Sequence, residues 1–144
     1  MLKIVLMVAV CLAPTAYGAV PEHQFNPTLL SLVPDWHQKC VMYTGTTEDL
    51  IQQAKDGKFP EDDSLKRYNN CIWTHHNFLV DDKRVVNLKK LLYLLPKGWE
   101  SVGKTIKQCN TDVLNTGEND DVEFYWKIMK CYHDKVDPSQ YFFY

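Results

Sequence analysis

Apolar residues recur every third or fourth position along most of the chain, and no stretch alternates regularly between apolar and polar residues. Because that spacing places apolar side chains on one face of a helix, the pattern predicts an all-α fold. Residues that break or cap helices divide the pattern into short segments. We expect six helices, at residues 28–43, 48–55, 65–79, 83–95, 99–114 and 122–136.

Side chains that accept hydrogen bonds from a helix N-terminus precede five of these segments. The expected caps are Asn26, Thr46 or Thr47, Asp62 to Ser64, Asp81–Asp82, and Asn119 to Asp121. Pro27 suits the first turn of the first helix. Pro34 is expected to split or kink that helix, because proline lacks the backbone N–H.

The first 18 residues have the pattern of a secretory signal peptide. Lys3 supplies the positive end, residues 4–13 are apolar, and Ala16 and Gly18 are the small residues that a signal peptidase reads. The apolar run is shorter than the ~20 residues that cross a bilayer, and no later run is long enough. We therefore expect cleavage after Gly18, a secreted extracellular domain of residues 19–144, and no membrane insertion.

Composition and motifs exclude several classes of function. Loss of Lys3 leaves 15 basic and 18 acidic residues, a net charge of −3. The charges are interspersed, which argues against nucleic acid as a partner. There is no glycine-rich phosphate loop and no Gly-x-Ser-x-Gly motif, and His75–His76 lacks the spacing of helical zinc ligands. We expect no catalysis, no cofactor and no metal.

Four cysteines remain after the signal peptide, which contains Cys11. They are Cys40, Cys71, Cys109 and Cys131. An even number in an exported chain favours two disulfides, whereas buried reduced cysteines would fit a cytosolic protein. The number alone leaves three pairings open.

The spacing of these cysteines resembles that of insect odorant-binding proteins of the pheromone and general odorant type. That family usually has six cysteines, with three residues between the second and third and eight between the fifth and sixth. The cysteines of this chain match the first, third, fourth and sixth. Segments 41–45 and 87–96 also resemble the family, in its turn after the first helix and in its fourth helix.

Arg67 stands at the place of the family's second cysteine, and Val122 at the place of its fifth. Those two cysteines bond to each other in the family, so their joint absence leaves no unpaired thiol. This pattern resembles the four-cysteine minus-C branch. The disulfides that the resemblance implies are Cys40–Cys71 and Cys109–Cys131.

The resemblance implies a carrier that binds a small apolar organic ligand, such as an odorant or pheromone, in an internal pocket. Two disulfides, worth about 3–4 kcal/mol each in the chain-entropy model, let a helical shell tolerate a cavity. A helical stripe does not distinguish the wall of a cavity from ordinary core. The candidate wall residues are Trp73, Phe78, Leu88, Leu92, Trp99, Val102, Ile106, Phe124, Ile128 and Met129.

The chain ends in four aromatic residues, Tyr141, Phe142, Phe143 and Tyr144. They would form an apolar patch if exposed. Members of the resembling family often fold their terminal segment over or into the pocket. We therefore expect this tail to be part of the pocket wall or lid, with a frayed terminus as the alternative.

Three histidines lie near expected helix ends: His75, His76 and His133. A pH-dependent release of ligand is one interpretation, and a surface or capping role is the other. Two further functions fit the same fold. The apolar faces could bind a receptor or peptide partner in a non-olfactory role, or the chain could carry or scavenge lipids outside olfaction. For the carrier itself, an olfactory receptor is a candidate further partner. We expect a monomer or weak dimer.

Overall fold

The computed structural model describes residues 24–75 and 78–144. Within these ranges the chain forms six α-helices and a short 3₁₀ helix, and the β pairing is limited to one bridge between Val80 and Val86. The elements are α1 (Pro27–Thr44), α2 (Glu48–Lys55), α3 (Asp63–Thr74), α4 (Leu88–Leu94), α5 (Glu100–Asn115), α6 (Asp121–Lys135) and η3 (Pro138–Gln140). The all-α prediction is confirmed.

The predicted signal peptide, residues 1–18, lies outside the described residues and stays a prediction. Among the helices that the structure describes, none combines the length and apolar character needed to cross a membrane.

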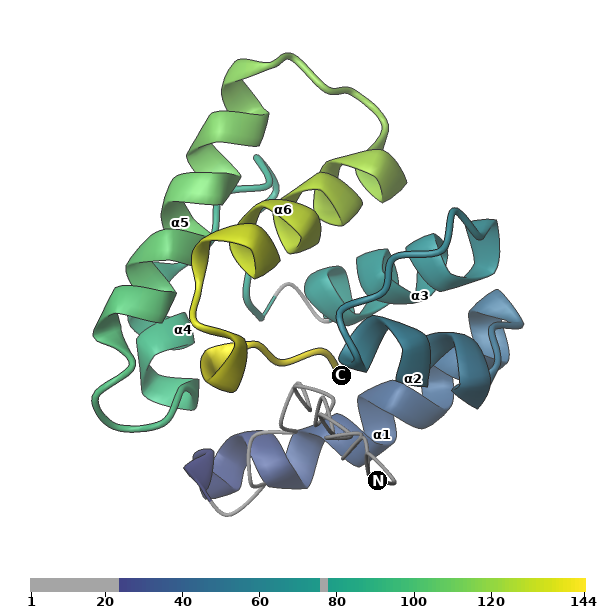
Figure 1. Cartoon of the computed structure of the whole chain (residues 1–144), viewed down its shortest axis with the longest axis horizontal. Helices are drawn as coiled ribbons and strands as arrows, with labels where there is room; N and C mark the ends of the chain where they lie inside the picture. Colours follow the sequence, from purple (N-terminus) through teal and green to yellow (C-terminus); the bar gives the residue numbers. More distant parts are fainter. Residues whose placement is uncertain (1–23, 76–77) are drawn as a thin grey trace, which may run out of the picture.

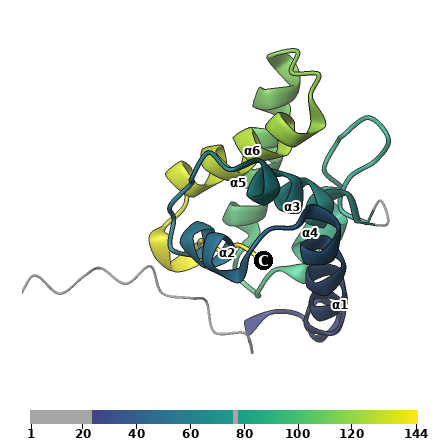
Figure 2. The same ribbon diagram turned by 90° about the vertical axis from the view of Figure 1, so that its right-hand side faces the viewer.

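The helices surround the end of the chain. Figures 1 and 2 both show the segment after η3 running inward, so that the C-terminus lies near the centre of the molecule. The most extensive helix contacts join α3 and α5 to α6, α1 to α3, and α4 to α5. The chain therefore encloses its own last residues.

Most of the expected helix starts are correct because the capping side chains act locally. Asn26 Oδ1 accepts a hydrogen bond from the Thr28 N–H at 2.8 Å, and Thr47, Asp62 and Asp120 cap α2, α3 and α6 in the same way. Pro34 does not split α1, which runs through it as one helix. The Pro34 side chain is exposed, so water can bond to the carbonyl that lacks its N–H partner.

The expected helix at 83–95 is wrong over its first half, and the expected cap at Asp81–Asp82 is wrong with it. Asp81 Oδ1 accepts hydrogen bonds from the N–H groups of Lys83 and Val85, both at 2.9 Å, which forms a tight turn instead of a helix start. Asn87 is the actual cap, since its side chain accepts from the Lys90 N–H. Likewise α3 ends at Thr74, five residues before the expected position.

This turn is held against α5 and α6 by side chains. The fully buried Asn110 accepts from the Val86 N–H at 3.0 Å and donates to the Arg84 carbonyl at 2.8 Å. The Lys107 ammonium donates to the Val86 carbonyl. The Arg84 guanidinium lies 4.4 Å from the centre of the Phe124 ring. Residues 80–87 therefore close one end of the helical shell.

Two disulfides connect the helices in pairs, and they are the pairs that the resemblance implies. Cys40–Cys71 joins α1 to α3 across 31 residues, and Cys109–Cys131 joins α5 to α6 across 22 residues. Loops of these lengths give a stabilisation of about 3–4 kcal/mol each in the chain-entropy model.

No disulfide joins α3 to α6 in the described residues, and an ion-pair network centred on the nearly buried Lys66 lies between them. The Lys66 side chain is 10% exposed, and its ammonium lies 2.5 Å from Glu61 and 2.7 Å from Glu123 on α6. Glu61 also lies 3.4 Å from Lys130. Lys66 and Glu123 are sequence neighbours of Arg67 and Val122, which stand where the family's other two cysteines would be.

Replacement of Lys66 by methionine should therefore lower the free energy of unfolding by about 1–2 kcal/mol, because two carboxylates lose their shared cation. Arg67→Met is the control: its side chain is 63% exposed and its ion pair is 3.9 Å long, so we expect little change. Urea denaturation of both variants measures the difference.

The effect of Lys66→Met should depend on pH in a defined direction. Hydrogen bonding to Lys66 lowers the pKa of Glu61, and hydrogen bonds to Glu123 and Glu61 raise the pKa of Lys66. The contribution of the Glu61 carboxylate to the free energy of unfolding is complete above its unfolded pKa of ~4.3, and it is lost as the pH falls through the lower pKa of the folded state. The contribution of Lys66 to the free energy of unfolding is complete below its unfolded pKa of ~10.4, and it is lost as the pH rises through the higher pKa of the folded state. A destabilisation that does not shrink below about pH 4 would contradict this assignment.

Candidate functional site

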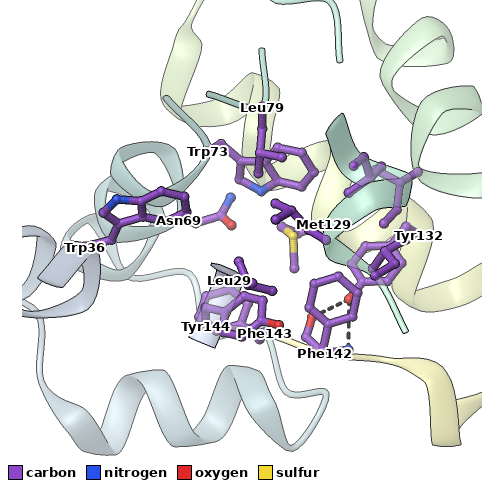
Figure 3. Close-up of a pocket in the computed structure, with 14 residues that line it drawn as sticks. Leu29, Trp36, Asn69, Trp73, Leu79, Met129, Tyr132, Phe142, Phe143 and Tyr144 are labelled. Carbon is purple, nitrogen blue, oxygen red and sulfur yellow. Dashed lines mark hydrogen bonds between the residues drawn. The ribbon is translucent and has the colours of Figure 1, made fainter. Parts of the chain in front are cut away.

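An apolar cavity of about 50 Å³ lies between the helices and the C-terminal tail. Figure 3 shows its wall, with side chains from α1, α3 and α6 facing the tail. Asn69 and two tyrosine hydroxyls are the polar side-chain groups of the wall, apart from the indole nitrogens. The lining residues are Leu29, Trp36, Asn69, Trp73, Leu79, Leu91, Leu94, Leu95, Ile106, Met129, Tyr132, Phe142, Phe143 and Tyr144.

Helical spacing places these side chains together. Leu29 and Trp36 are seven residues apart on α1, which brings both to the same face. Asn69 and Trp73 are four apart on α3. Leu79 comes from the segment between α3 and α4. The remaining wall residues come from α4 and its C-cap, from α5 and α6, and from the tail. The cavity is therefore the meeting point of five helices, the segment between α3 and α4, and the terminal segment.

The structure brings six of the fourteen residues expected at the site into this wall. They are Trp73, Ile106, Met129, Phe142, Phe143 and Tyr144. The other eight, Phe78, Leu88, Leu92, Trp99, Val102, Phe124, Ile128 and Tyr141, lie elsewhere.

Most of these eight pack between elements or face an outer groove. Val102, Phe124 and Ile128 are buried in the helix contacts. Leu92 and Trp99 line a groove outside α4, and Leu92 packs so closely over Gly103 that an added Cβ there would lie 2.5 Å from its methyl group.

The remaining three are more peripheral to the cavity. Phe78 is half-buried, with its ring centre 5.8 Å from that of Trp36. Leu88 is half-buried at the start of α4. Tyr141 is buried beside α2, where its hydroxyl donates to the Ala54 carbonyl.

The sequence analysis missed several wall residues, and some of them had a readable signal. Leu91, Leu94 and Leu95 lie in the leucine-rich segment, and Leu29 and Trp36 form a stripe on the first helix. Asn69 had no such signal, because an asparagine in an amphipathic helix is usually a surface residue.

The tail forms one side of the cavity and is fixed by hydrogen bonds. The buried Tyr132 hydroxyl accepts from the Phe142 N–H at 2.9 Å and donates to the Phe142 carbonyl. The Tyr141 hydroxyl donates to the Ala54 carbonyl at 2.7 Å. Phe25 packs edge-on against Phe142, at 5.5 Å between ring centres. The last four residues are thus packed into the body rather than frayed.

A second hollow of about 380 Å³ lies on the other side of the tail. It is bounded by Phe25, by residues of α1 and α2, and by residues 141–144. Phe142, Phe143 and Tyr144 line both this groove and the inner cavity. These three tail residues therefore lie between the two spaces.

The groove is lined in part by charged and polar side chains, whereas the inner cavity has no charged side chain in its wall. His37 lies at the groove with Nδ1 2.8 Å from the Tyr68 hydroxyl and Nε2 2.8 Å from Glu48. Burial raises the pKa of Tyr68, Tyr132 and Tyr141, so these hydroxyls stay neutral. No lining residue of the inner cavity is acidic or basic.

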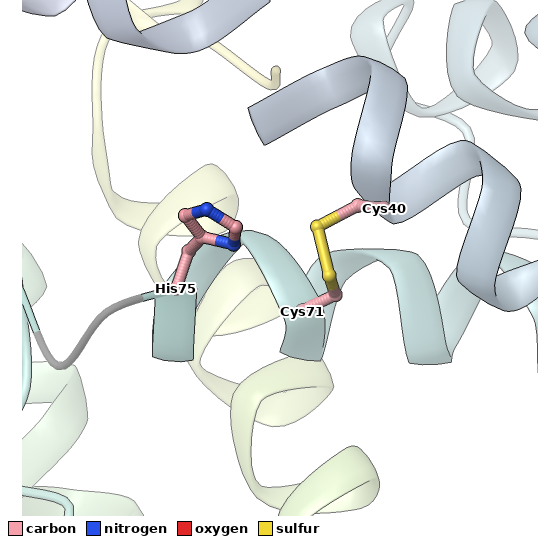
Figure 4. A group of neighbouring side chains, drawn as sticks. All are labelled: Cys40, Cys71 and His75. Carbon is pink, nitrogen blue, oxygen red and sulfur yellow. A yellow bond between two sulfur atoms is a disulfide. The ribbon is translucent and has the colours of Figure 1, made fainter. Parts of the chain in front are cut away.

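Cys40, Cys71 and His75 form a cluster of metal-ligand type, with ligand atoms within 4.8 Å of one another (Figure 4). The two sulfur atoms are bonded as a disulfide, so they lack the thiolate form that binds zinc. In the oxidised chain this cluster is a structural crosslink beside a histidine.

The histidines considered for a pH switch lie at aromatic contacts. The His75 ring centre is 5.5 Å from Trp36, and the His133 ring centre is 4.7 Å from Tyr141 in the tail. His76 lies outside the described residues. A pH-dependent release stays a prediction.

Comparisons with known proteins agree on one family. The family model described as PBP/GOBP matches residues 22–135 of this chain. General odorant-binding protein 69a of Drosophila melanogaster is 27% identical over 120 residues, which cover 81% of this chain and 78% of the relative.

Solved structures share the fold. Odorant-binding protein 5 of Apis mellifera aligns with a TM-score of 0.65 at 22% identity, covering 81% of this chain and 95% of that one. Odorant-binding protein 7 of Anopheles gambiae, which has four disulfide bridges and was solved in complex with an azo compound, gives 0.62 at 18% identity, with coverages of 77% and 88%. An odorant-binding protein of Locusta migratoria gives 0.59 at 21% identity, with coverages of 77% and 84%.

Removal of the Tyr132 hydroxyl should loosen the tail. Tyr132→Phe keeps the ring but loses both hydrogen bonds to Phe142, so we expect a loss of about 1–2 kcal/mol in the free energy of unfolding. The Phe142 amide should exchange with deuterium roughly tenfold faster, since 1.4 kcal/mol corresponds to a factor of ten. Hydrogen-exchange mass spectrometry of the C-terminal peptide measures this. Tyr43→Phe, at a residue 72% exposed on α1, is the control and should change neither quantity.

Proposed function

The chain belongs to the PBP/GOBP family, and from that premise we propose that it is a secreted carrier that binds small apolar molecules in the space between its helices and its tail. Members of this family are non-enzymatic carriers. Odorants, pheromones or similar semiochemicals are the proposed cargo. An olfactory receptor as a further partner, and a monomeric or weakly dimeric state, are part of the same proposal.

The observation that carries this proposal is the composition of the inner wall. Its residues are almost entirely aliphatic or aromatic and no member is charged. An apolar guest loses no hydrogen bonds on entering such a space, and the hydrophobic effect favours its transfer from water. Met129 adds a flexible side chain that can adapt to guests of different shape.

The size of the cavity indicates how a guest would enter. An engineered protein cavity that binds benzene measures ~150 Å³, whereas this one measures about 50 Å³. A guest larger than a few heavy atoms therefore needs the space that Phe142, Phe143 and Tyr144 occupy. Displacement of the tail would join the cavity to the 380 Å³ groove, within the ~300–1,000 Å³ range of ligand pockets. The proposed binding site is this combined space.

A protein-binding role is the second candidate, and a surface feature favours it. Met42 and Tyr43 are adjacent at the end of α1, with 69% and 72% of their surfaces exposed. They lie outside the cavity wall, so the two candidate functions depend on different residues.

Displacement of the dye N-phenyl-1-naphthylamine by a series of medium-chain alcohols and ketones tests the carrier function. Ile106→Phe adds volume inside the wall and should weaken binding of the series about tenfold, the equivalent of 1.4 kcal/mol. The double variant Met42→Ser/Tyr43→Ser should bind like the original chain. The reverse pattern, with loss only in the α1 variant, would favour surface binding.

A chain that ends after Gln140 tests the role of the tail. Removal of residues 141–144 joins the two spaces, so affinity should rise with ligand length more steeply than in the full chain, by up to ~0.8 kcal/mol for each additional buried methylene. Titration with C6 to C14 alcohols gives the slope of affinity against ligand length for the truncated chain and for the full chain. An equal loss of affinity at every length would instead mean that the tail is a fixed part of the wall.

A further inference from the structure

Asn69 has a buried amide group that the fold does not use. The residue is 2% exposed, on the face of α3 that lines the cavity. Within the described part of the chain, its side-chain nitrogen Nδ2 has no hydrogen-bond partner. Figure 3 shows the amide projecting toward the middle of the cavity, between Trp36, Trp73 and Met129. A donor of hydrogen bonds is thus directed into an otherwise apolar space.

Such a group normally lowers stability, because a buried N–H that loses its bonds to water needs a replacement. Neighbouring protein groups do not supply one. The Tyr132 hydroxyl is already bonded to both the N–H and the carbonyl of Phe142. The Tyr144 hydroxyl also belongs to the wall but makes no hydrogen bond with Asn69 Nδ2. Apart from the indole nitrogens, the side chains of the rest of the wall consist of carbon and the Met129 sulfur.

Water is a poor partner for Asn69. The cavity of about 50 Å³ has room for a water molecule, which needs ~10–15 Å³. A buried water is held well when it makes about three hydrogen bonds, and the wall here is predominantly apolar. An oxygen atom that belongs to an apolar guest would satisfy the amide and bury the guest's carbon chain at the same time.

We infer that Asn69 determines which ligands are preferred: its Nδ2 donates a hydrogen bond to an oxygen acceptor of the guest. The inference rests on the carrier function proposed above. It assigns the ligand class as apolar molecules with one carbonyl, ester or hydroxyl oxygen, in preference to pure hydrocarbons. The oxygen lies beside α3, and the carbon chain extends toward Phe142 and Tyr144.

A pair of ligands with the same shape tests this assignment. 2-Decanone carries a carbonyl oxygen where 2-methyl-1-decene carries a methylene group. The ratio of their affinities therefore measures how much the oxygen contributes to binding. Dye displacement gives that ratio for the original chain and for Asn69→Leu. Because a neutral hydrogen bond contributes ~0.5–1.5 kcal/mol, the ratio should shift by roughly 2- to 12-fold against the ketone in the variant.

Further variants separate recognition from an effect of volume or folding. Asn69→Ala leaves more room and should shift the ratio in the same direction. Asn70→Leu changes the adjacent residue, which does not line the cavity, and should leave the ratio unchanged. The thermal midpoint of Asn69→Leu should rise, because the unpaired amide is removed.

The outcomes of this experiment are distinct. If both ligands displace the dye and the ratio is the same with and without Asn69, the assignment of Asn69 is overturned while the carrier function stands. If neither ligand displaces the dye from the original chain, the carrier function fails and this inference fails with it.

Discussion

Two disulfide bonds make it possible for this protein to stay folded around an incompletely filled core. Cys40–Cys71 joins α1 to α3 and Cys109–Cys131 joins α5 to α6, so four of the six described helices are held in pairs. A small helical domain usually needs a completely filled core to stay folded. Because these links restrict the unfolded chain, the folded shell can include an imperfectly filled space without losing its stability.

An ion-pair network adds to the apolar packing between α3 and α6, which includes the stacked rings of Trp73 and Tyr125. Lys66 lies between Glu61 and Glu123 and is nearly buried. A charge network is reversible and responds to pH and salt, whereas a disulfide does not. One of the interactions that join these two helices can therefore weaken locally. Asn69 and Tyr132 project from these same helices, so their separation bears on the shape of the cavity.

Local chemistry explains which parts of the fold could be predicted. The helices at 28–43 and 122–136 were located to within one residue at each end because capping and apolar spacing act over a few positions. The helix at 99–114 has no side-chain cap and was located equally well from its apolar spacing. The helix at 83–95 failed because the Asp81 side chain competes for backbone N–H groups, an outcome that the apolar pattern does not encode. The residues of the cavity wall were harder to predict than the helices. Ile128 and Met129 are neighbours on α6, yet only Met129 lines the cavity. That difference depends on how helices cross, which no single segment specifies.

The position of the last residues has a consequence for how affinity and selectivity evolve. Phe142, Phe143 and Tyr144 are part of the same molecule as the space that they occupy. In the carrier function proposed here they would act as an intramolecular competitor, whose effective concentration is fixed by the chain and never diluted. Every guest that needs their place meets the same competition, whatever its structure. Changes that weaken the packing of the tail would then raise the affinities of all guests large enough to need its place, while changes in the helical wall would alter the ranking among those guests.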